Sequence, residues 1–384
     1  MRAITTEGVP VFIDLDDEQA ALRDELKAYY AELMNPDVRR EMEHEEGTGP
    51  IRRRIVEQLG TDGWIAMGWP EEYGGQGKSA VEQFIFYDET MRVGSPAPML
   101  TINTVGPTIM DYGTPEQKEF FLPEIAAGRL HFCIGYSEPD AGTDLASLAT
   151  RAVRDGDEYI INGQKTWTSL ALGCDYIWLA ARTDPDVSKH KGISLFAIPI
   201  DTPGITLEPL NLLSTHNINH TFLDDVRVPA TSIIGEENQG WRLITSQLNR
   251  ERVTLCSSAM VERALENAVA FARETSRADG TPVIDIPWVR RNLAEVSAEL
   301  EYLRLLNWKV AWSVATNWHT PVPFAPPHVP PCMPPTAGLT LATPCALHFG
   351  IPRTPFNLSI RLTHRCRVFN IRPNVGYVSA TSCI

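Results

Sequence analysis

Residues 132–144 (FCIGYSEPDAGTD) combine an apolar run with a hydroxyl, an acid and small turn residues. The apolar part favours a strand that reaches Ser137, and Pro139 and Gly142 must end any strand pairing beyond it. Backbone N–H groups are therefore released where small side chains leave room for a flat ring. The segment predicts a binding site for a planar molecule at the end of a strand.

A second segment, residues 163–169 (GQKTWTS), places an aromatic side chain between hydroxyls at the exit of a predicted hairpin. Trp167 could lie against one face of a planar ligand, with Ser137 and Ser169 providing hydrogen bonds at its edge. The alternative is that Trp167 is an ordinary core aromatic and that Ser137 is a hydroxyl at a strand end. The residues alone leave both interpretations open.

Three regions of different periodicity would have to position these residues. Helical spacing and capping-box signals predict an all-helical domain over residues 1–127. Short runs separated by turn signals predict six or seven strands over residues 128–240, arranged as an antiparallel sandwich or barrel. Helical spacing returns over about 241–273 and again over 287–312. We therefore expect an α+β fold class.

Residues 313–384 differ in composition from everything before them. None of the chain's 48 acidic residues and no lysine falls in this segment, which contains 12 prolines. Prolines at this density exclude helix interiors and favour extended polyproline conformations. We interpret 313–384 as an aberrant tail that we expect to be disordered, and a frameshift would account for it.

The overall composition excludes several classes of protein. A formal net charge of −14 argues against nucleic acid and anionic membrane surfaces as partners. No apolar run is long enough for a transmembrane helix, and no signal-peptide pattern stands at the N-terminus, so we expect a soluble, cytoplasmic protein. The seven cysteines include no CxxC pair and no histidine cluster accompanies them, so no metal site is predicted.

Taken together, segments 132–144 and 163–169 resemble the flavin-binding β-domain of acyl-CoA dehydrogenases. The resemblance extends from about residue 15 to Trp312. It implies the fold of that family, with an N-terminal helical domain (1–127), a middle β-domain (128–240) and a C-terminal helical domain that is truncated here (241–312). It also implies that FAD is the cofactor.

The resemblance assigns residues to the cofactor. Ser137 would lie at the N5 and O4 edge of the flavin, and the backbone of Tyr136 and Ser137 would support the pyrimidine part. Trp167 would cover one face of the ring, with Ser169 on the N5 side. At the adenine end the similarity is weaker, and Arg277 is the one residue that could substitute for the family's usual contacts.

It also assigns residues to the substrate. Gly142 and Thr143 match the position where the family binds the thioester-proximal part of acyl-CoA. The alternative is a simple turn capped by Thr143, which is compatible with that role. Asn249 and Arg252 match substrate-side positions of the family. An aspartate more often stands at the first of these, so Asn249 keeps the hydrogen bonding but loses the charge.

Glu251 matches the catalytic base of a minority of the family. Most members carry this glutamate late in the last helical region, whereas isovaleryl- and long-chain-type enzymes carry it on the earlier helix, in a Leu-x-x-Glu-Arg context like that of residues 248–252. A desolvated carboxylate has a raised pKa and can remove a proton α to a thioester. The alternative is a solvated glutamate paired with Arg250 or Arg252.

The resemblance implies conversion of an acyl-CoA to the trans-2-enoyl-CoA, with electrons passed to an electron-transfer flavoprotein, in a homo- or hetero-oligomer with another acyl-CoA dehydrogenase chain. Two rival interpretations stay open. The chain could be a non-catalytic subunit, or the inactive product of a disrupted gene. It could also be an acyl-CoA oxidase, which would pass electrons to O₂ rather than to an acceptor protein.

Overall fold

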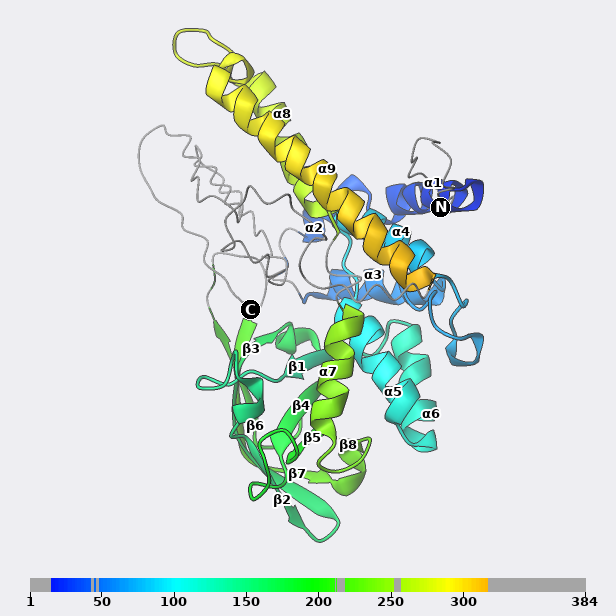
Figure 1. Ribbon diagram of the computed structural model, residues 1–384, viewed down its shortest axis with the longest axis vertical. Helices are drawn as coiled ribbons and strands as arrows, with labels where there is room; N and C mark the ends of the chain where they lie inside the picture. The colour runs from blue at the N-terminus through cyan, green and yellow to red at the C-terminus, as the bar shows by residue number, and fades with distance from the viewer. Residues whose placement is uncertain are drawn as a thin grey trace, which may run out of the picture. The chain divides into compact units, whose positions relative to one another are not determined.

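The computed structural model describes residues 15–42, 45, 48–210, 212, 218–251 and 257–316, with the backbone alone for 248–251. The predicted tail therefore lies almost entirely outside the described residues. Three groups of elements follow one another along the chain (Figure 1). They confirm the predicted order of a helical part, a β-sheet part and a second helical part.

The first part consists of helices whose starts the sequence marks clearly. Their bounds are α1 Asp17–Leu33, α2 Pro36–Met42, α3 Pro50–Thr61, α4 Ala80–Val93, α5 Gly106–Tyr112 and α6 Pro115–Ala126. Capping boxes at Asp16, Ser79 and Thr114 begin α1, α4 and α6, because each side chain accepts the N–H of the third helical residue. A π-helical turn, Thr101–Val105, leads into α5.

The middle part is one mixed sheet of eight strands within the described residues. The strands are β1 Phe132–Gly135, β2 Arg151–Asp155, β3 Glu158–Ser169, β4 Tyr176–Arg182, β5 Ile193–Pro199, β6 Ile205–Leu210, β7 Ile218–Pro229 and β8 Ile233–Ile234. They follow the order β6-β7-β3-β2-β4-β5-β8, with β1 paired to β4.

Two pairings correct the prediction of a purely antiparallel sheet. β1 runs parallel to β4 over four residue pairs, and β2 meets β4 in parallel at Arg151 and Arg182. Two parallel strands must be joined by a long crossover connection. Here the chain between β1 and β4, which contains β2 and β3, forms that connection. Alternate residues of β4 then serve two cores: Trp178 packs with the helices, and Ile177 and Leu179 pack within the folded sheet.

The last part contains α7 Gly240–Glu251, α8 Ala259–Glu274 and α9 Pro287–Ala315. The prediction of one helix over 241–273 is wrong, because Ser257 and Ser258 are not helical. Ser257 donates to Asp88 at 2.7 Å and accepts the N–H of Ala259 at 3.1 Å, so its side chain competes with the helix for hydrogen bonds. α9 also continues three residues beyond the predicted end at Trp312.

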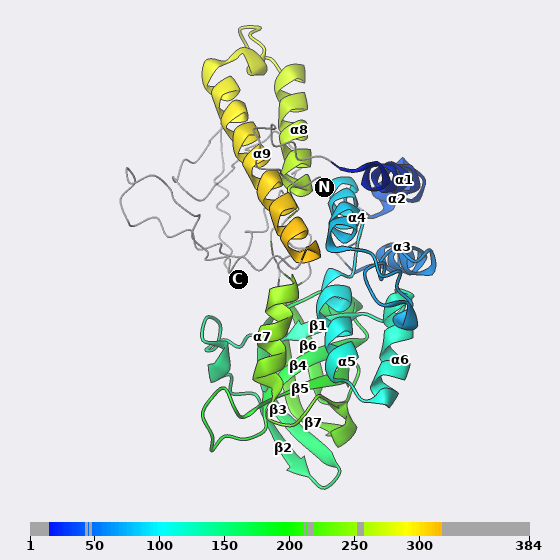
Figure 2. The ribbon, with the colours of Figure 1, turned by 45° about the vertical axis from the view of Figure 1, so that its right-hand side comes forward.

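α7 lies against the sheet beside β5, and α8 and α9 form a helical hairpin (Figure 2). One stripe of α9 is buried, consisting of Val289, Val296, Leu300, Asn307 and Ala311. Among the residues that the structure describes, no helix is long and apolar enough to cross a lipid bilayer.

Candidate functional site

The turn after β1 and the end of β3 lie side by side. The N–H of Thr166 donates to the carbonyl oxygen of Ser137 at 2.9 Å, and the Lys165 ammonium donates to that of Tyr136 at 3.2 Å. Consecutive residues of β3 thus hold consecutive carbonyls of the turn, and Ser137 stays half-buried there. The structure therefore brings together the two segments that carry the predicted flavin contacts.

A β-bulge in β3 directs Trp167 away from the sheet core. Opposite β7, Lys165 pairs with Thr221 and Thr168 pairs with Asn219, so β3 has one more residue than its partner between these pairs. Trp167 adopts a left-handed φ of 63°, which is strained for a bulky residue, and its side chain is 46% exposed. The indole is therefore not a core aromatic, which was the alternative interpretation of this residue.

Buried polar groups hold the Thr168 end of the bulge. The Asn219 side-chain amide donates to the Thr168 carbonyl at 3.0 Å, and the Thr221 hydroxyl donates to the Thr168 hydroxyl at 3.0 Å. All three side chains are fully buried. Because each of the three side chains makes a buried hydrogen bond, the strand after the bulge has little freedom to move, and the Trp167 backbone is held in its unusual conformation.

A buried ion pair lies directly beneath this arrangement. Lys165 is fully buried, and its ammonium is 2.7 Å from the Glu138 carboxylate. Burial lowers the pKa of Lys165 to about 8, although Glu138 opposes this shift. Burial alone would raise the pKa of Glu138. The charge of Lys165 and the hydrogen bonds donated by Ala149 and Thr150 nevertheless hold this pKa below its ordinary value.

The side chain of Tyr136 points into a buried hydrogen-bond network rather than toward solvent. Its hydroxyl donates to the Gln247 side-chain oxygen and accepts from the Trp178 indole N–H at 3.1 Å. Gln247 in turn donates to the Thr108 hydroxyl at 3.0 Å. The network links the β1 turn to α7 and α5.

Glu251 is the last residue of α7, four positions after Gln247. A spacing of four places two residues on the same side of a helix. The side chains of Glu251 and Asn249 lie outside the described residues, and so does all of Arg252. Their predicted roles stay predictions.

The remaining predicted site residues lie in two places. Gly142, Thr143 and Ser169 are exposed near the turn and the strand end described above, and an added Cβ at Gly142 would meet nothing within 4 Å. Arg277 lies in the turn between α8 and α9, where its described partners, Asp279 and Thr281, belong to the same turn. The structure does not bring Arg277 to the other residues.

Sequence reasoning missed several residues that organise the site. Lys165, Glu138 and Gln247 are polar residues at buried positions, and their burial depends on which segments become neighbours in the fold. His220 of β7 lies beside Trp167, with 6.5 Å between ring centroids. The motifs do contain Lys165, two positions before Trp167, and Glu138, directly after Ser137. The sequence alone assigned neither of them a partner.

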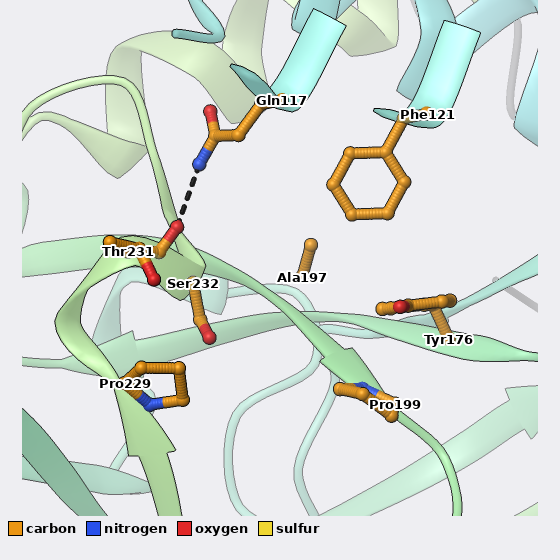
Figure 3. A pocket seen from close by; sticks show the side chains of 8 residues that line it. All are labelled: Gln117, Phe121, Tyr176, Ala197, Pro199, Pro229, Thr231 and Ser232. Atoms are coloured by element: carbon orange, nitrogen blue, oxygen red, sulfur yellow. Dashed lines mark hydrogen bonds between the residues drawn. The ribbon is translucent and has the colours of Figure 1, made fainter. Parts of the chain in front are cut away.

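A separate cavity of about 240 Å³ lies between α6 and the β4–β5 side of the sheet (Figure 3). Its lining contains no carboxylate, amine or imidazole, and none of the predicted site residues takes part. Gln117 at its edge donates to the carbonyls of Thr231 and Ile233, both at 2.8 Å, so this amide holds two parts of the chain together. Among the described residues no cluster of His, Cys, Asp or Glu could hold a metal ion.

Comparison with known proteins identifies the family. Residues 16–129, 133–226 and 238–326 match the N-terminal, middle and C-terminal domains of acyl-CoA dehydrogenases. The chain is 52% identical to acyl-CoA dehydrogenase FadE26 of Mycobacterium tuberculosis over 305 residues, which cover 78% of this chain and 76% of that protein. The chain belongs to the acyl-CoA dehydrogenase family. It is therefore related to flavoprotein oxidoreductases of fatty acid and steroid oxidation.

Two solved structures are similar as well. A chain of the ChsE4-ChsE5 complex from Mycobacterium tuberculosis is 51% identical, with a TM-score of 0.73 over 79% of this chain and 78% of that chain. A structure described as the Tcur3481-Tcur3483 steroid ACAD is 48% identical, with a TM-score of 0.73 and the same coverage. The match of the C-terminal domain reaches residue 326, beyond the end of the resemblance expected at Trp312.

The residues present fit the cofactor of this family. A flavin needs an aromatic or apolar surface for one ring face and hydrogen-bonding groups at its edge. Trp167 presents an exposed indole from a backbone that the bulge fixes, and the half-buried Ser137 lies on the adjoining turn. Both requirements are thus met by side chains from two segments that hydrogen-bond to each other.

Proposed function

We propose that this protein catalyses the FAD-dependent α,β-dehydrogenation of an acyl-CoA thioester to the trans-2-enoyl-CoA. The observation that carries the proposal is the exposed, backbone-strained Trp167 beside Ser137, in a chain of the acyl-CoA dehydrogenase family. Strain at an exposed aromatic costs stability, so a ligand-binding role supplies a reason for it.

Each residue would then have a defined task. FAD, when bound, supplies the acceptor for the hydride that leaves the β-carbon. Glu251 removes the α-proton: the Cα–H bond breaks, the proton passes to the Glu251 carboxylate, and the electron pair of that bond forms the Cα=Cβ double bond as the hydride leaves the β-carbon. Ser137 and Trp167 orient the ring at its edge and face, with Tyr136 and Ser169 beside them. Gly142 and Thr143 allow the thioester end to approach, and Asn249 and Arg252 bind on the substrate side.

The substrate class we propose is an acyl-CoA that carries a steroid substituent. This rests on the Tcur3481-Tcur3483 protein, which is described as a steroid ACAD and is 48% identical to this chain. We further propose that the electrons pass to an electron-transfer flavoprotein rather than to O₂. Peroxide formation during aerobic turnover would contradict this part of the proposal and favour an acyl-CoA oxidase.

Association with another acyl-CoA dehydrogenase chain completes the proposal. The relative of known structure is a complex of two chains, ChsE4 and ChsE5. On this chain Tyr302 and Leu305 of α9 are 57% and 48% exposed, so this helix has apolar surface available for a partner. Arg277, whose described contacts stay within its own turn, would reach FAD across such an interface.

The decisive experiment is anaerobic reduction of the flavin by substrate. The purified chain, alone and after mixing with a related acyl-CoA dehydrogenase chain, is titrated with FAD and then with a steroid-side-chain acyl-CoA. Loss of the flavin absorbance near its visible maximum and formation of the enoyl-CoA are expected. Absence of flavin binding in both samples would contradict the proposal and favour a non-catalytic chain. Bleaching by a straight-chain acyl-CoA alone would leave the reaction standing and overturn the substrate class.

A further inference from the structure

The Glu138–Lys165 pair connects three separate segments of the β-domain. Lys165 lies on β3, and its ammonium donates to the Glu138 carboxylate at 2.7 Å and to the Tyr136 carbonyl at 3.2 Å. The same carboxylate accepts the N–H groups of Ala149 at 2.6 Å and Thr150 at 2.9 Å, just before β2. A single carboxylate therefore joins the turn after β1, the entry to β2 and the middle of β3.

The turn itself is closed on both sides of Glu138. The backbone of Glu138 and that of Ala141 exchange hydrogen bonds of 3.0 and 3.1 Å, which makes a small loop. Before it, the carbonyls of Tyr136 and Ser137 are bound by Lys165 and Thr166. Hydrogen bonds before and after Glu138 thus fix the position of Ser137 relative to β3, and Lys165 of the ion pair makes one of them.

Fold stability is a poor explanation for the two charges. Removing two charges from water is costly, and apolar residues of similar volume in place of a buried ion pair often leave a protein equally stable or more stable. What a charged pair adds is direction, because the ammonium and carboxylate hold several partners in one fixed geometry. The partners here are the backbone groups of Tyr136, Ala149 and Thr150, and the bulge at Trp167 follows Lys165 directly on the same strand.

We propose that Glu138 and Lys165 are positioning residues that fix the Ser137 edge contact relative to the Trp167 face contact. This inference rests on the proposed function, because it gives the pair a role toward the flavin site. Neither residue needs to touch the cofactor. Their effect is transmitted through the backbone carbonyls of Tyr136 and Ser137 and through the register of β3.

The test compares two double variants that remove one ion pair each. Glu138→Gln/Lys165→Met removes both buried charges with little change of volume, so that no charge is left buried alone. Asp144→Asn/Lys189→Met is the matched control. It removes an exposed ion pair in which the Lys189 ammonium is 2.6 Å from the carboxylate of Asp144, a residue close to the same turn. Hydrogen exchange of the apo-proteins and the dissociation constant for FAD are measured for both, together with the apo unfolding midpoint.

We expect faster hydrogen exchange in residues 136–142 and 165–169 of the first variant, with the β4–β5 ladder unchanged. We also expect its FAD dissociation constant to rise by about tenfold or more, which is the range seen when residues that orient a metal ligand are removed. The apo midpoint should fall only modestly, because the glutamine oxygen replaces one of the two carboxylate acceptors and one backbone N–H loses its partner. The control should match the unaltered chain in all three measurements.

Two results separate failure of this inference from failure of the proposed function. If the unaltered chain binds FAD and the first variant binds it within threefold as tightly, the positioning role is overturned while the proposed function stands. If the unaltered chain binds no FAD even at high concentration, the proposed function is contradicted. Exchange rates then still decide the local role, and equal rates in residues 136–142 overturn it.

Discussion

Glu251 is the residue on which turnover depends most directly in the proposed reaction. We expect Glu251→Gln to reduce turnover by about 10²–10⁴-fold, which is the range for loss of a general base. Any bound flavin should be retained, because the proposed cofactor contacts lie in the turn after β1, on β3 and at Arg277, and none of them lies on α7. Steady-state rates and the flavin content of the purified variant are the measurements. Activity within threefold of the unaltered enzyme would rule out this base.

Trp167 allows a separation of cofactor binding from folding. Its side chain is 46% exposed, so we expect Trp167→Ala to change the free energy of unfolding by only about 0.5 kcal/mol. Loss of the stacked indole should cost FAD binding at least the aromatic contribution of about 0.5–1.5 kcal/mol. Phe120→Ala, at a similarly exposed aromatic residue on α6, is the control and should leave FAD affinity unchanged. A large fall of the apo unfolding midpoint in Trp167→Ala with unchanged FAD affinity would refute the stacking role.

Lys165 predicts an unusual dependence of stability on pH. Burial lowers its pKa from 10.5 to about 8, with Glu138 opposing and Arg182 adding to the shift. At a pH between these two pKa values the unfolded chain binds more protons than the folded chain. The free energy of unfolding therefore increases as pH rises, by at most about 1.4 kcal/mol per pH unit. Relative to Lys165→Met, the unaltered chain should therefore gain stability from pH 8 to 10. Urea unfolding across this range measures it, and a relative loss of stability would contradict the expected sign.

At the scale of elements, α7 is attached to the β1 turn through Gln247. We expect Gln247→Leu to destabilise the fold by about 1–3 kcal/mol, since the Tyr136 and Thr108 hydroxyls lose a buried partner. It should also lower kcat, because α7 ends at Glu251. The matched control is Gln117→Leu, another buried glutamine, which holds the chain at Thr231 and Ile233 (Figure 3). The control should lose stability without a specific loss of kcat; equal losses of kcat in both variants would contradict the role of Gln247.

Local signals predicted the elements well where chain neighbours determine them. The capping boxes at Ser79 and Thr114 begin α4 and α6 as expected, because a cap depends on residues three positions apart. The break between α7 and α8 was missed because it depends on Ser257 finding Asp88, a residue of α4. The parallel pairing of β1 with β4 was missed for a similar reason, since strand partners far apart in sequence leave no local signal.

The candidate site was also predictable only where residues close together in the sequence determine it. Ser137 and Trp167 stand in short motifs whose residue types suggest their chemistry, and the fold brings those motifs together. The burial of Lys165, by contrast, depends on its contact with Glu138 across the sheet. The pattern of apolar and polar residues along β3 does not decide which face of the sheet Trp167 occupies. Only the extra residue opposite Thr221 and Asn219 decides its direction.

For the molecule as a whole, the exposed apolar residues of α9 predict self-association or binding to a related chain. We expect Leu305→Glu to shift the protein toward the monomer, because a charge on an apolar interface must be desolvated without a partner. Sedimentation velocity of the full chain, alone and with a related acyl-CoA dehydrogenase chain, measures this. Glu295→Gln changes the charge at an exposed polar position of the same helix and should have no effect. A monomeric unaltered chain that binds no partner would contradict the prediction.

The bulge in β3 also determines which genetic changes this region can tolerate. Lys165 and Thr168 lie three residues apart on β3, yet they oppose Thr221 and Asn219, which lie two apart on β7. Removal of one residue between Lys165 and Thr168 would therefore restore regular pairing and remove the bulge. Thr168 would keep its place opposite Asn219, but the left-handed conformation that directs the indole away from the sheet would be lost. A substitution at Trp167 alters one side chain, whereas a single-codon deletion beside it would remove the bulge that positions that side chain. In natural variation of this segment we therefore expect exchanged residues but a constant length.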